Sequence, residues 1–192
     1  LPYARVCARF HGRPLPVPRR LTVPPLRRWA ASGPLPRALR DAAAASLARG
    51  AQLFAFVPRV DAVPGVVQRF RDAFPDIAVD GTSSRDEARA EKVSAFRDRT
   101  LRVIVTTTIL ERGVTVPKTD VFVLDADCAL FDDASLVQMA GRAGRKAEDP
   151  GGFVWFCSAD WTAAQKAAIR DVRAMNSEAR RKGYLLDDDG DA

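Results

Sequence analysis

Short apolar runs alternate along most of this chain with longer amphipathic or alanine-rich stretches. Runs of β-branched and aromatic residues are typical of strands buried on both faces, and the stretches between them have the length and composition of helices. This alternation predicts an α/β fold in which a mainly parallel sheet is covered by helices on both faces. We expect strands at residues 52–57, 77–79, 101–105, 121–124 and 153–157, and helices at residues 35–49, 61–73, 84–99, 136–140 and 162–182.

Turn and capping residues set the ends of these helices. Gly50 and Gly183 are placed to end the first and the last helix. Asp61 is placed to cap the second helix, and Ser84 with Glu87 has the spacing of a capping box. The sequence therefore predicts that the third helix starts at Ser84.

The chain divides by composition into three parts. Residues 1–33 are rich in proline and arginine, which forbids long helices, and we expect an extended connector with one short strand at most. Residues 34–184 hold the predicted α/β domain. Residues 185–192 form an acidic tail.

The overall composition is ordinary for a soluble globular protein: 28% of the 192 residues are charged and 47% are hydrophobic. No apolar run reaches the roughly 18–20 residues of a membrane span, and no signal peptide is visible, so we expect a cytoplasmic protein without direct membrane insertion. Three scattered cysteines support neither a disulfide framework nor a zinc site, and we predict no metal ligands. The first residue, Leu1, indicates a fragment of a longer protein.

Charge is distributed unevenly. Residues 1–50 hold ten arginines and one acid, a net charge of +9, so the rest of the chain carries −3 because the whole carries +6. A basic arm of this kind favours contact with an anion, most simply nucleic acid. A solvated basic linker is the alternative that composition leaves open.

The segment from Gln138 to Arg145 reads Q-x-x-G-R-x-G-R. Its two arginines are three residues apart, which would place both guanidiniums on one face of a helix. Guanidinium groups bind phosphate oxygens in pairs, as a phosphoryl-transfer site requires. The string resembles motif VI of superfamily 2 helicases, which implies that Arg142 and Arg145 are catalytic arginines and that both, with Gln138, face the nucleotide.

A β-branched run upstream ends in three threonines and continues to Gly113 and Pro117. Hydroxyl groups at the end of a strand hold a nucleic-acid backbone without reading its sequence. The segment resembles motif V of the same superfamily, which implies that Thr107, with Thr106, contacts the backbone and that Gly113 and Thr115 lie near the nucleotide. Thr115 stands where many relatives carry an aspartate for the ribose, so a ribose contact is in doubt.

The phosphate-binding loop of ATPases and an Asp-Glu pair at the end of an apolar strand are both absent from this sequence. Motifs V and VI without those elements describe the second of two RecA-like lobes, a three-layer α/β domain. ATP and Mg²⁺ would then be bound mainly by the first lobe, and the nucleotide-facing groups of this lobe would sit on strand-to-helix loops.

Further segments resemble the competence protein FA (ComFA) family of DNA-uptake ATPases. They are Phe10 to Pro16 in the connector, Val57-Pro58-Arg59, and Met175 to Ala179 in the last helix. The resemblance implies an ATP-dependent translocase or helicase for single-stranded DNA, with an amino-terminal RecA-like lobe and competence proteins at the membrane pore as partners. It implies a cytoplasmic location, with the inner face of the membrane as one possibility, and this fragment alone is predicted to be inactive.

Four more residues are candidate DNA contacts. Thr82 and Ser83 precede the third helix, where free amides bind phosphate. Arg89 matches a superfamily arginine near nucleic acid, although an ordinary surface arginine explains it equally well. Arg59 contacts either the nucleotide or DNA, and the sequence does not choose between them.

Asp125 and Asp127 end a strand without histidine support, so a loop interaction with Arg142 explains them better than a metal site does. Two alternative functions stay open for the whole chain. One is the C-terminal lobe of a primosomal or repair-type helicase, and the other is a noncatalytic interaction domain with a helicase-like fold. A Rossmann-type enzyme is disfavoured because no G-x-G-x-x-G follows the first predicted strand.

Overall fold

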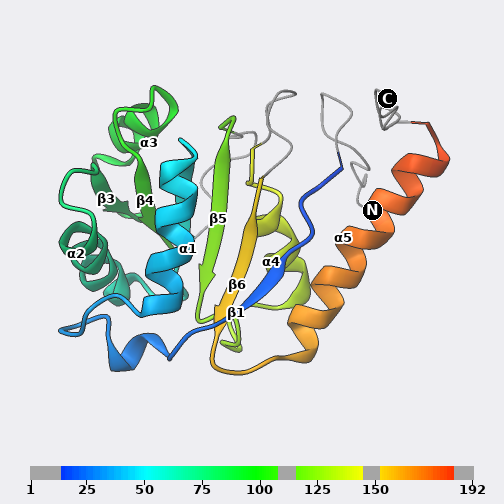
Figure 1. Cartoon of the computed structure of the whole chain (residues 1–192), viewed down its shortest axis with the longest axis horizontal. Coiled ribbons are helices and arrows are strands. Elements are labelled where there is room, and N and C mark those ends of the chain that lie inside the picture. Colours follow the sequence, from blue (N-terminus) through cyan, green and yellow to red (C-terminus); the bar gives the residue numbers. More distant parts are fainter. Residues whose placement is uncertain (1–13, 108–115, 145–151, 184–192) are drawn as a thin grey trace.

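The computed structural model describes residues 14–107, 116–144 and 152–183. These residues form an α/β domain with one sheet (Figure 1). The strands are β1 (Arg19–Thr22), β2 (Gln52–Phe56), β3 (Val79–Thr82), β4 (Val103–Thr106), β5 (Thr119–Leu124) and β6 (Val154–Ser158). The helices are α1 (Arg37–Ala48), α2 (Val63–Ala73), α3 (Arg89–Arg97), α4 (Asp133–Ala140) and α5 (Ala163–Arg181), with the 3-10 turns η1 (Leu26–Arg28) and η2 (Val60–Ala62).

The sheet has six strands in the order β1-β6-β5-β2-β4-β3, and every neighbouring pair is parallel. All strands therefore point the same way, so the loops that follow them gather at one end of the sheet. We call this end the carboxyl end; it is the lower end of β5 and β6 in Figure 1.

Helices cover both faces of the sheet, as the alternation of the sequence predicts. On one face α1 and α2 pack on alternate strand residues such as Leu53 and Val105. On the other face α3, α4 and α5 pack on the intervening residues, such as Phe54 and Ile104. Side chains of adjacent strand residues point to opposite faces, so each of the four inner strands β2, β4, β5 and β6 contributes to two separate hydrophobic cores. The predicted three-layer architecture is confirmed.

The predicted boundaries fail around β3 and α3. β3 begins at Val79, not at Ile77, because the Ile77 amide closes a turn onto Phe74. The predicted capping box does not form either. α3 begins at Arg89, after a turn held by Asp86, whose carboxylate accepts the Ala88 amide at 3.0 Å. Asp61 likewise does not cap α2 but lies within η2.

Residues 14–33, which the sequence predicts as a connector, contribute to the sheet and the core. β1 pairs with β6 at the edge of the sheet. Farther upstream, the side-chain amide of Asn176 on α5 accepts the Leu15 amide at 2.8 Å and donates to the Leu15 carbonyl at 2.9 Å. Leu15 and Asn176 belong to two of the three segments that resemble ComFA proteins. Their pair of hydrogen bonds fixes the chain that enters β1.

Asp120 on β5 forms the main buried polar cluster of the described core. Its carboxylate is fully buried. It accepts hydrogen bonds from Ser46 of α1, from Arg49 just after α1, and from the Phe153 amide before β6. Arg49 is 2.8 Å from the carboxylate and also stacks on the Phe153 ring. One carboxylate therefore joins α1, β5 and the start of β6.

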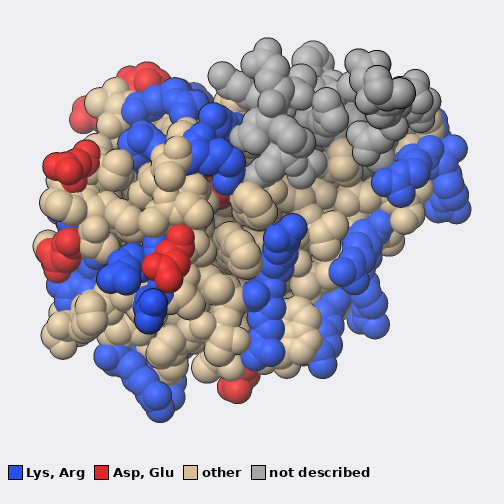
Figure 2. Space-filling model, viewed as in Figure 1, with Lys and Arg blue, Asp and Glu red and all other residues tan. Residues whose placement is uncertain are grey.

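Acidic side chains are unevenly distributed over the face seen in Figure 2. Most of them lie over the half that carries α2 and α3, together with many lysines and arginines, whereas the charged side chains along β1 and α5 in this view are almost all basic. Within the described residues, every helix is too short or too polar to cross a membrane.

Replacing Asp120 by alanine should lower the free energy of unfolding by about 3–5 kcal/mol, because Arg49 would lose the carboxylate that neutralises it. Asp41, an exposed acid on α1 that lies 3.8 Å from two arginines, gives the matched control. Asp41→Ala should change stability by about 0.5 kcal/mol or less. Urea unfolding of both variants measures the difference, and equal losses would show that the Asp120 cluster is not a stability determinant.

Candidate nucleotide and nucleic-acid site

The candidate DNA contacts lie together at the carboxyl end of β3, β4 and β2. In the sheet register Thr82 lies beside Thr106, and Thr106 lies beside Phe56. The loops that leave these strands begin at Ser83, Thr107 and Val57, with Arg59 two residues farther on. Residues far apart in the sequence therefore form one row along the edge of the sheet.

Members of this row differ in accessibility. Thr82 and Thr106 are buried, and the Thr82 hydroxyl donates to Asp86 at 2.9 Å. Their buried side chains therefore support the loops and are not accessible to a ligand. Thr107 and Ser83 are half-buried and Arg59 is exposed, so these three can reach a ligand.

A lysine fixes the loop after β3. Lys92 on α3 donates to the Gly81 carbonyl and to the Asp86 carboxylate, each at 2.8 Å. The hydrogen bond from Lys92 holds the pKa of Asp86 below its usual range, and the same bond raises the pKa of Lys92. Arg89 begins α3 beside this loop, and its buried Nε has no acceptor within the described part of the chain.

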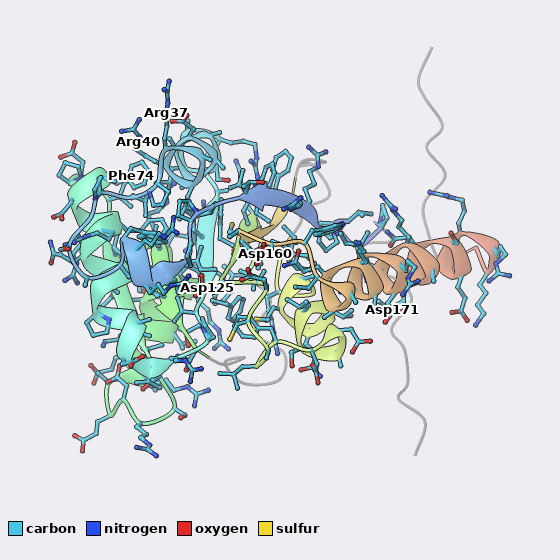
Figure 3. The ribbon with its side chains drawn as sticks, turned by 90° about the horizontal axis from the view of Figure 1, so that it is seen from below. Arg37, Arg40, Phe74, Asp125, Asp160 and Asp171 are labelled. Atoms are coloured by element: carbon cyan, nitrogen blue, oxygen red, sulfur yellow. The ribbon has the colours of Figure 1, made fainter. Side chains whose placement is uncertain are left out.

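Beside the row, at the carboxyl ends of β2, β5 and β6, lies a cavity of about 660 Å³ that Arg59 and Asp125 help to line. Asp125 accepts the Leu26 amide at 3.0 Å, and burial raises the pKa of its carboxyl group. Figure 3 views this end directly and shows Asp125 and Asp160 near its centre. Asp127 accepts the Asp160 amide at 3.2 Å.

The predicted interaction of Asp125 or Asp127 with Arg142 is wrong. Both carboxylates follow β5, whereas Arg142 follows α4, which runs back along the sheet toward the start of β5. The two acids hold loops of this lobe together instead.

Motif VI occupies the end of α4 and the turn after it. α4 begins at a side-chain cap, Asp132, which accepts the Ser135 amide at 2.8 Å, and ends at Ala140. Gln138 is exposed on its last turn. Arg142 is half-buried in the following turn, where its amide bonds to the Met139 carbonyl, and burial lowers the pKa of its guanidinium.

Gly144 is the last described residue of motif VI. It forms an antiparallel bridge with Thr119, the first residue of β5, through two hydrogen bonds of 3.0 and 3.1 Å. A Cβ atom at Gly144 would lie 1.8 Å from the Val116 carbonyl oxygen, so the backbones of motifs V and VI are in direct contact. The helix does not continue past Ala140, and the prediction of two arginines on one helical face is wrong.

The described candidates lie at opposite ends of the sheet, with Gln138 and Arg142 near the amino end of β5 and the DNA candidates at the carboxyl ends of β3, β4 and β2. Gly144 lies at the amino end of β5, whereas Thr107 follows the carboxyl end of β4. The sequence predicts Arg142 on a strand-to-helix loop. In the structure it follows α4 and precedes β6, so it lies on a helix-to-strand connection. The described residues of motif V lie at both ends, with Thr107 after the carboxyl end of β4 and Val116 beside Gly144.

Arg145, Gly113 and Thr115 lie outside the described residues, so their contacts stay predictions.

Comparison with known proteins shows the family. Residues 35–147 match the helicase conserved C-terminal domain. The chain belongs to this family. It is also 35% identical over 171 residues to the competence protein ComFA of Streptococcus pneumoniae, a match that covers 89% of the chain and 40% of that protein. ComFA of Bacillus subtilis is 34% identical over 177 residues, covering 92% of the chain and 38% of that protein.

The resemblance to ComFA proteins is thus confirmed, and it extends beyond the helicase domain match. The chain spans about two fifths of the length of these relatives. Among solved structures, RecG bound to a three-way DNA junction has a TM-score of 0.55 at 17% identity, covering 90% of the chain and 21% of RecG. That likeness supports the fold alone.

Several residues that build the site are not evident from the motifs. Lys92 and Asp86 fix the loop after β3, and the only sequence signal is their i, i+6 spacing across the start of α3. The contact of Gly144 with Val116 and Thr119 could not be predicted either, because a glycine in a sequence motif does not indicate which residue it packs against. Asp132 could have been found, since Asp-Asp-Ala-Ser before an apolar run is a typical helix cap.

Two glycines of motif VI should respond differently to alanine. Gly144→Ala places Cβ against backbone, so either the Thr119 bridge breaks or β5 shifts, at a cost of about 1–3 kcal/mol or more. Gly141→Ala meets its nearest backbone atom at 3.3 Å and should be tolerated. Thermal unfolding of both variants tests this, and a Gly144→Ala protein as stable as Gly141→Ala would contradict the contact.

Proposed function

We propose that this chain is the second RecA-like lobe of an ATP-dependent translocase that moves single-stranded DNA during DNA uptake in natural transformation. The observation that carries the proposal is the junction of motifs V and VI at Gly144 and Val116. Through it, one continuous segment links the end of the sheet that holds Thr107 to the turn that holds Arg142. The similarity to ComFA over most of the chain supports DNA uptake rather than repair as the process.

The nucleotide would lie against the turn after α4. Gln138 and Arg142 fit this role because they offer an amide and a guanidinium four residues apart, at the motif VI end of the lobe. Arg142, with Arg145, would neutralise charge that develops on the phosphoryl oxygens. Gly113 and Thr115 are proposed as further nucleotide contacts from motif V.

ATP and Mg²⁺ would be held mainly by an amino-terminal RecA-like lobe. In the described part of this chain no three carboxylate, histidine or cysteine side chains are placed to hold a metal ion. When bound, ATP supplies the transferable phosphoryl group and Mg²⁺ neutralises part of its charge. Arg142 acts only when the two lobes come together.

The DNA backbone would lie along the carboxyl end of β3, β4 and β2. Thr107 and Ser83 offer hydroxyl and amide donors there, and Arg59 and Arg89 offer guanidinium groups. Contacts of this kind are independent of sequence, as uptake of foreign DNA requires.

Lobe closure on ATP would alternately tighten and release the strand, with motif V carrying the change between the two ends of the sheet. The proposed protein works on the cytoplasmic side of the membrane, beside competence proteins of the uptake pore. The fixed connector at Leu15 and Asn176 would give the first lobe a firm attachment point.

In the full-length protein, Arg142→Ala and Arg145→Ala should each reduce DNA-stimulated ATP turnover about 10³-fold or more, with a much smaller loss of ATP affinity, because these arginines act on charge present in the transition state. Arg142→Lys should not restore turnover, since an ammonium lacks the planar pair of donors. Arg37→Ala, which removes an arginine with an 88% exposed side chain, is the control.

Turnover and nucleotide affinity are measured on the same preparations, together with the melting temperature. Wild-type turnover in both alanine variants would end the proposed role. A lowered melting temperature with parallel losses of binding and turnover would assign the arginines to the structure of the loop instead.

Thr107→Val should weaken binding of a single-stranded oligonucleotide about 3- to 10-fold, the equivalent of one hydrogen bond. Thr100→Val, at an exposed position after α3, should leave the affinity unchanged. Fluorescence anisotropy with two unrelated oligonucleotides measures both variants. An unchanged affinity in Thr107→Val, or a strong preference for one of the two sequences, would contradict a backbone contact at this position.

A further inference from the structure

The outer face of α5 carries charge of one sign. Its exposed charged residues are all basic and recur at helical spacing: Lys166, Arg170, Arg173, Arg180, Arg181 and, just past the helix, Lys182. From Lys166 to Arg181 the stripe extends about 22 Å at about 1.5 Å per residue. The two acids of the helix are half-buried, and Glu178 pairs with Lys182 at 2.7 Å.

Single-sign stripes are unusual on helices that merely face water, where charges of both signs normally alternate. Lys166, Arg170, Arg173, Arg180 and Arg181 form no ion pair with any described residue. Like charges three and four residues apart repel one another. An anion lying along the helix would remove this repulsion.

The stripe continues onto the edge strand β1. Arg19 and Arg180 line the same hollow of about 340 Å³, together with Phe153. The Arg19 guanidinium lies 5.2 Å from the centre of the Phe153 ring, and the Arg20 guanidinium lies 5.6 Å from that of Trp161. Both rings are half-buried, and each has a guanidinium over its face.

We propose that this surface binds the phosphate backbone of nucleic acid, as a second contact remote from the carboxyl end of β3 and β4. The proposal rests on the proposed function for the identity of the ligand, single-stranded DNA. The charge pattern of β1 and α5 indicates where that ligand binds. A length of about 22 Å spans about six phosphates at the roughly 3.4 Å rise of a strand in a duplex, and fewer in a more extended single strand. We call the surface the β1–α5 basic face, made of Arg19, Arg20, Lys166, Arg170, Arg173, Arg180 and Arg181.

Nucleic acid fits this face better than an anionic membrane. Six of its seven cations are arginines, which bind phosphate oxygens in pairs. A membrane-binding helix needs large apolar side chains that insert into the lipid. In the described residues the large hydrophobic side chains that are exposed are Val60 and Leu130, which lie on loops after β2 and β5.

The test compares two double variants of the full chain, each of which removes two positive charges. Arg170→Gln with Arg173→Gln changes the basic face, and Arg37→Gln with Arg40→Gln changes exposed arginines of α1, away from α5 (Figure 3). Affinity for a fluorescent oligothymidine is measured across a range of salt concentrations. The first pair should weaken binding about 10-fold at low salt and reduce the slope of log affinity against log salt by about 1.4, or about 0.7 per phosphate contact.

The control pair should change neither quantity, and circular dichroism checks that both proteins are folded. Equal losses in the two pairs, or no loss in either, would overturn the proposal. Loss of binding to phosphatidylserine vesicles with unchanged oligonucleotide binding would reassign the face to membrane and also overturn it.

The same assay separates this proposal from the proposed function. Weaker binding in Thr107→Val with no effect of the α5 pair keeps the carboxyl-end site and discards the basic face. The reverse result keeps the basic face and removes Thr107 as a DNA contact.

Discussion

The backbone contact between Gly144 and Val116 is the constraint on which the site depends. Motif VI leaves its helix, pairs with the first residue of β5, and lies against the end of motif V so closely that no side chain fits between them. Because both segments are fixed to the same strand, a displacement of one is transmitted to the other. Under the proposed function, this contact links the turn that would face the nucleotide to the segment that begins at the proposed DNA contacts.

The fold could be predicted because its signals are local. Neighbouring apolar strand residues such as Leu53 and Phe54 indicate a strand that is buried on both faces. Gly50 and Gly183 have positive φ at the helix ends, where the sequence places helix-ending glycines. The capping box at Ser84 failed because a competing interaction won. Asp86 is held by Thr82 and by Lys92, and the helix starts only after that turn.

The candidate residues could be listed from the motifs, but their arrangement could not. Arg142 was expected on a strand-to-helix loop and near Asp125, and it lies at the other end of the sheet. These positions depend on where motif V begins and ends relative to the sheet, and no local sequence pattern predicts that. The hydrogen bonds of Asn176 to Leu15 likewise link residues 161 positions apart.

The central claim is that nucleotide and DNA occupy opposite ends of one sheet and communicate through motif V. Hydrogen exchange measured by mass spectrometry on the full-length protein tests it most directly, with a nonhydrolysable ATP analogue and single-stranded DNA added separately. The account predicts that the analogue alone protects residues 138–144 and that DNA alone protects residues 82–84 and the amide of Thr107. Protection of the same segment by both ligands, or the reverse assignment, would contradict it.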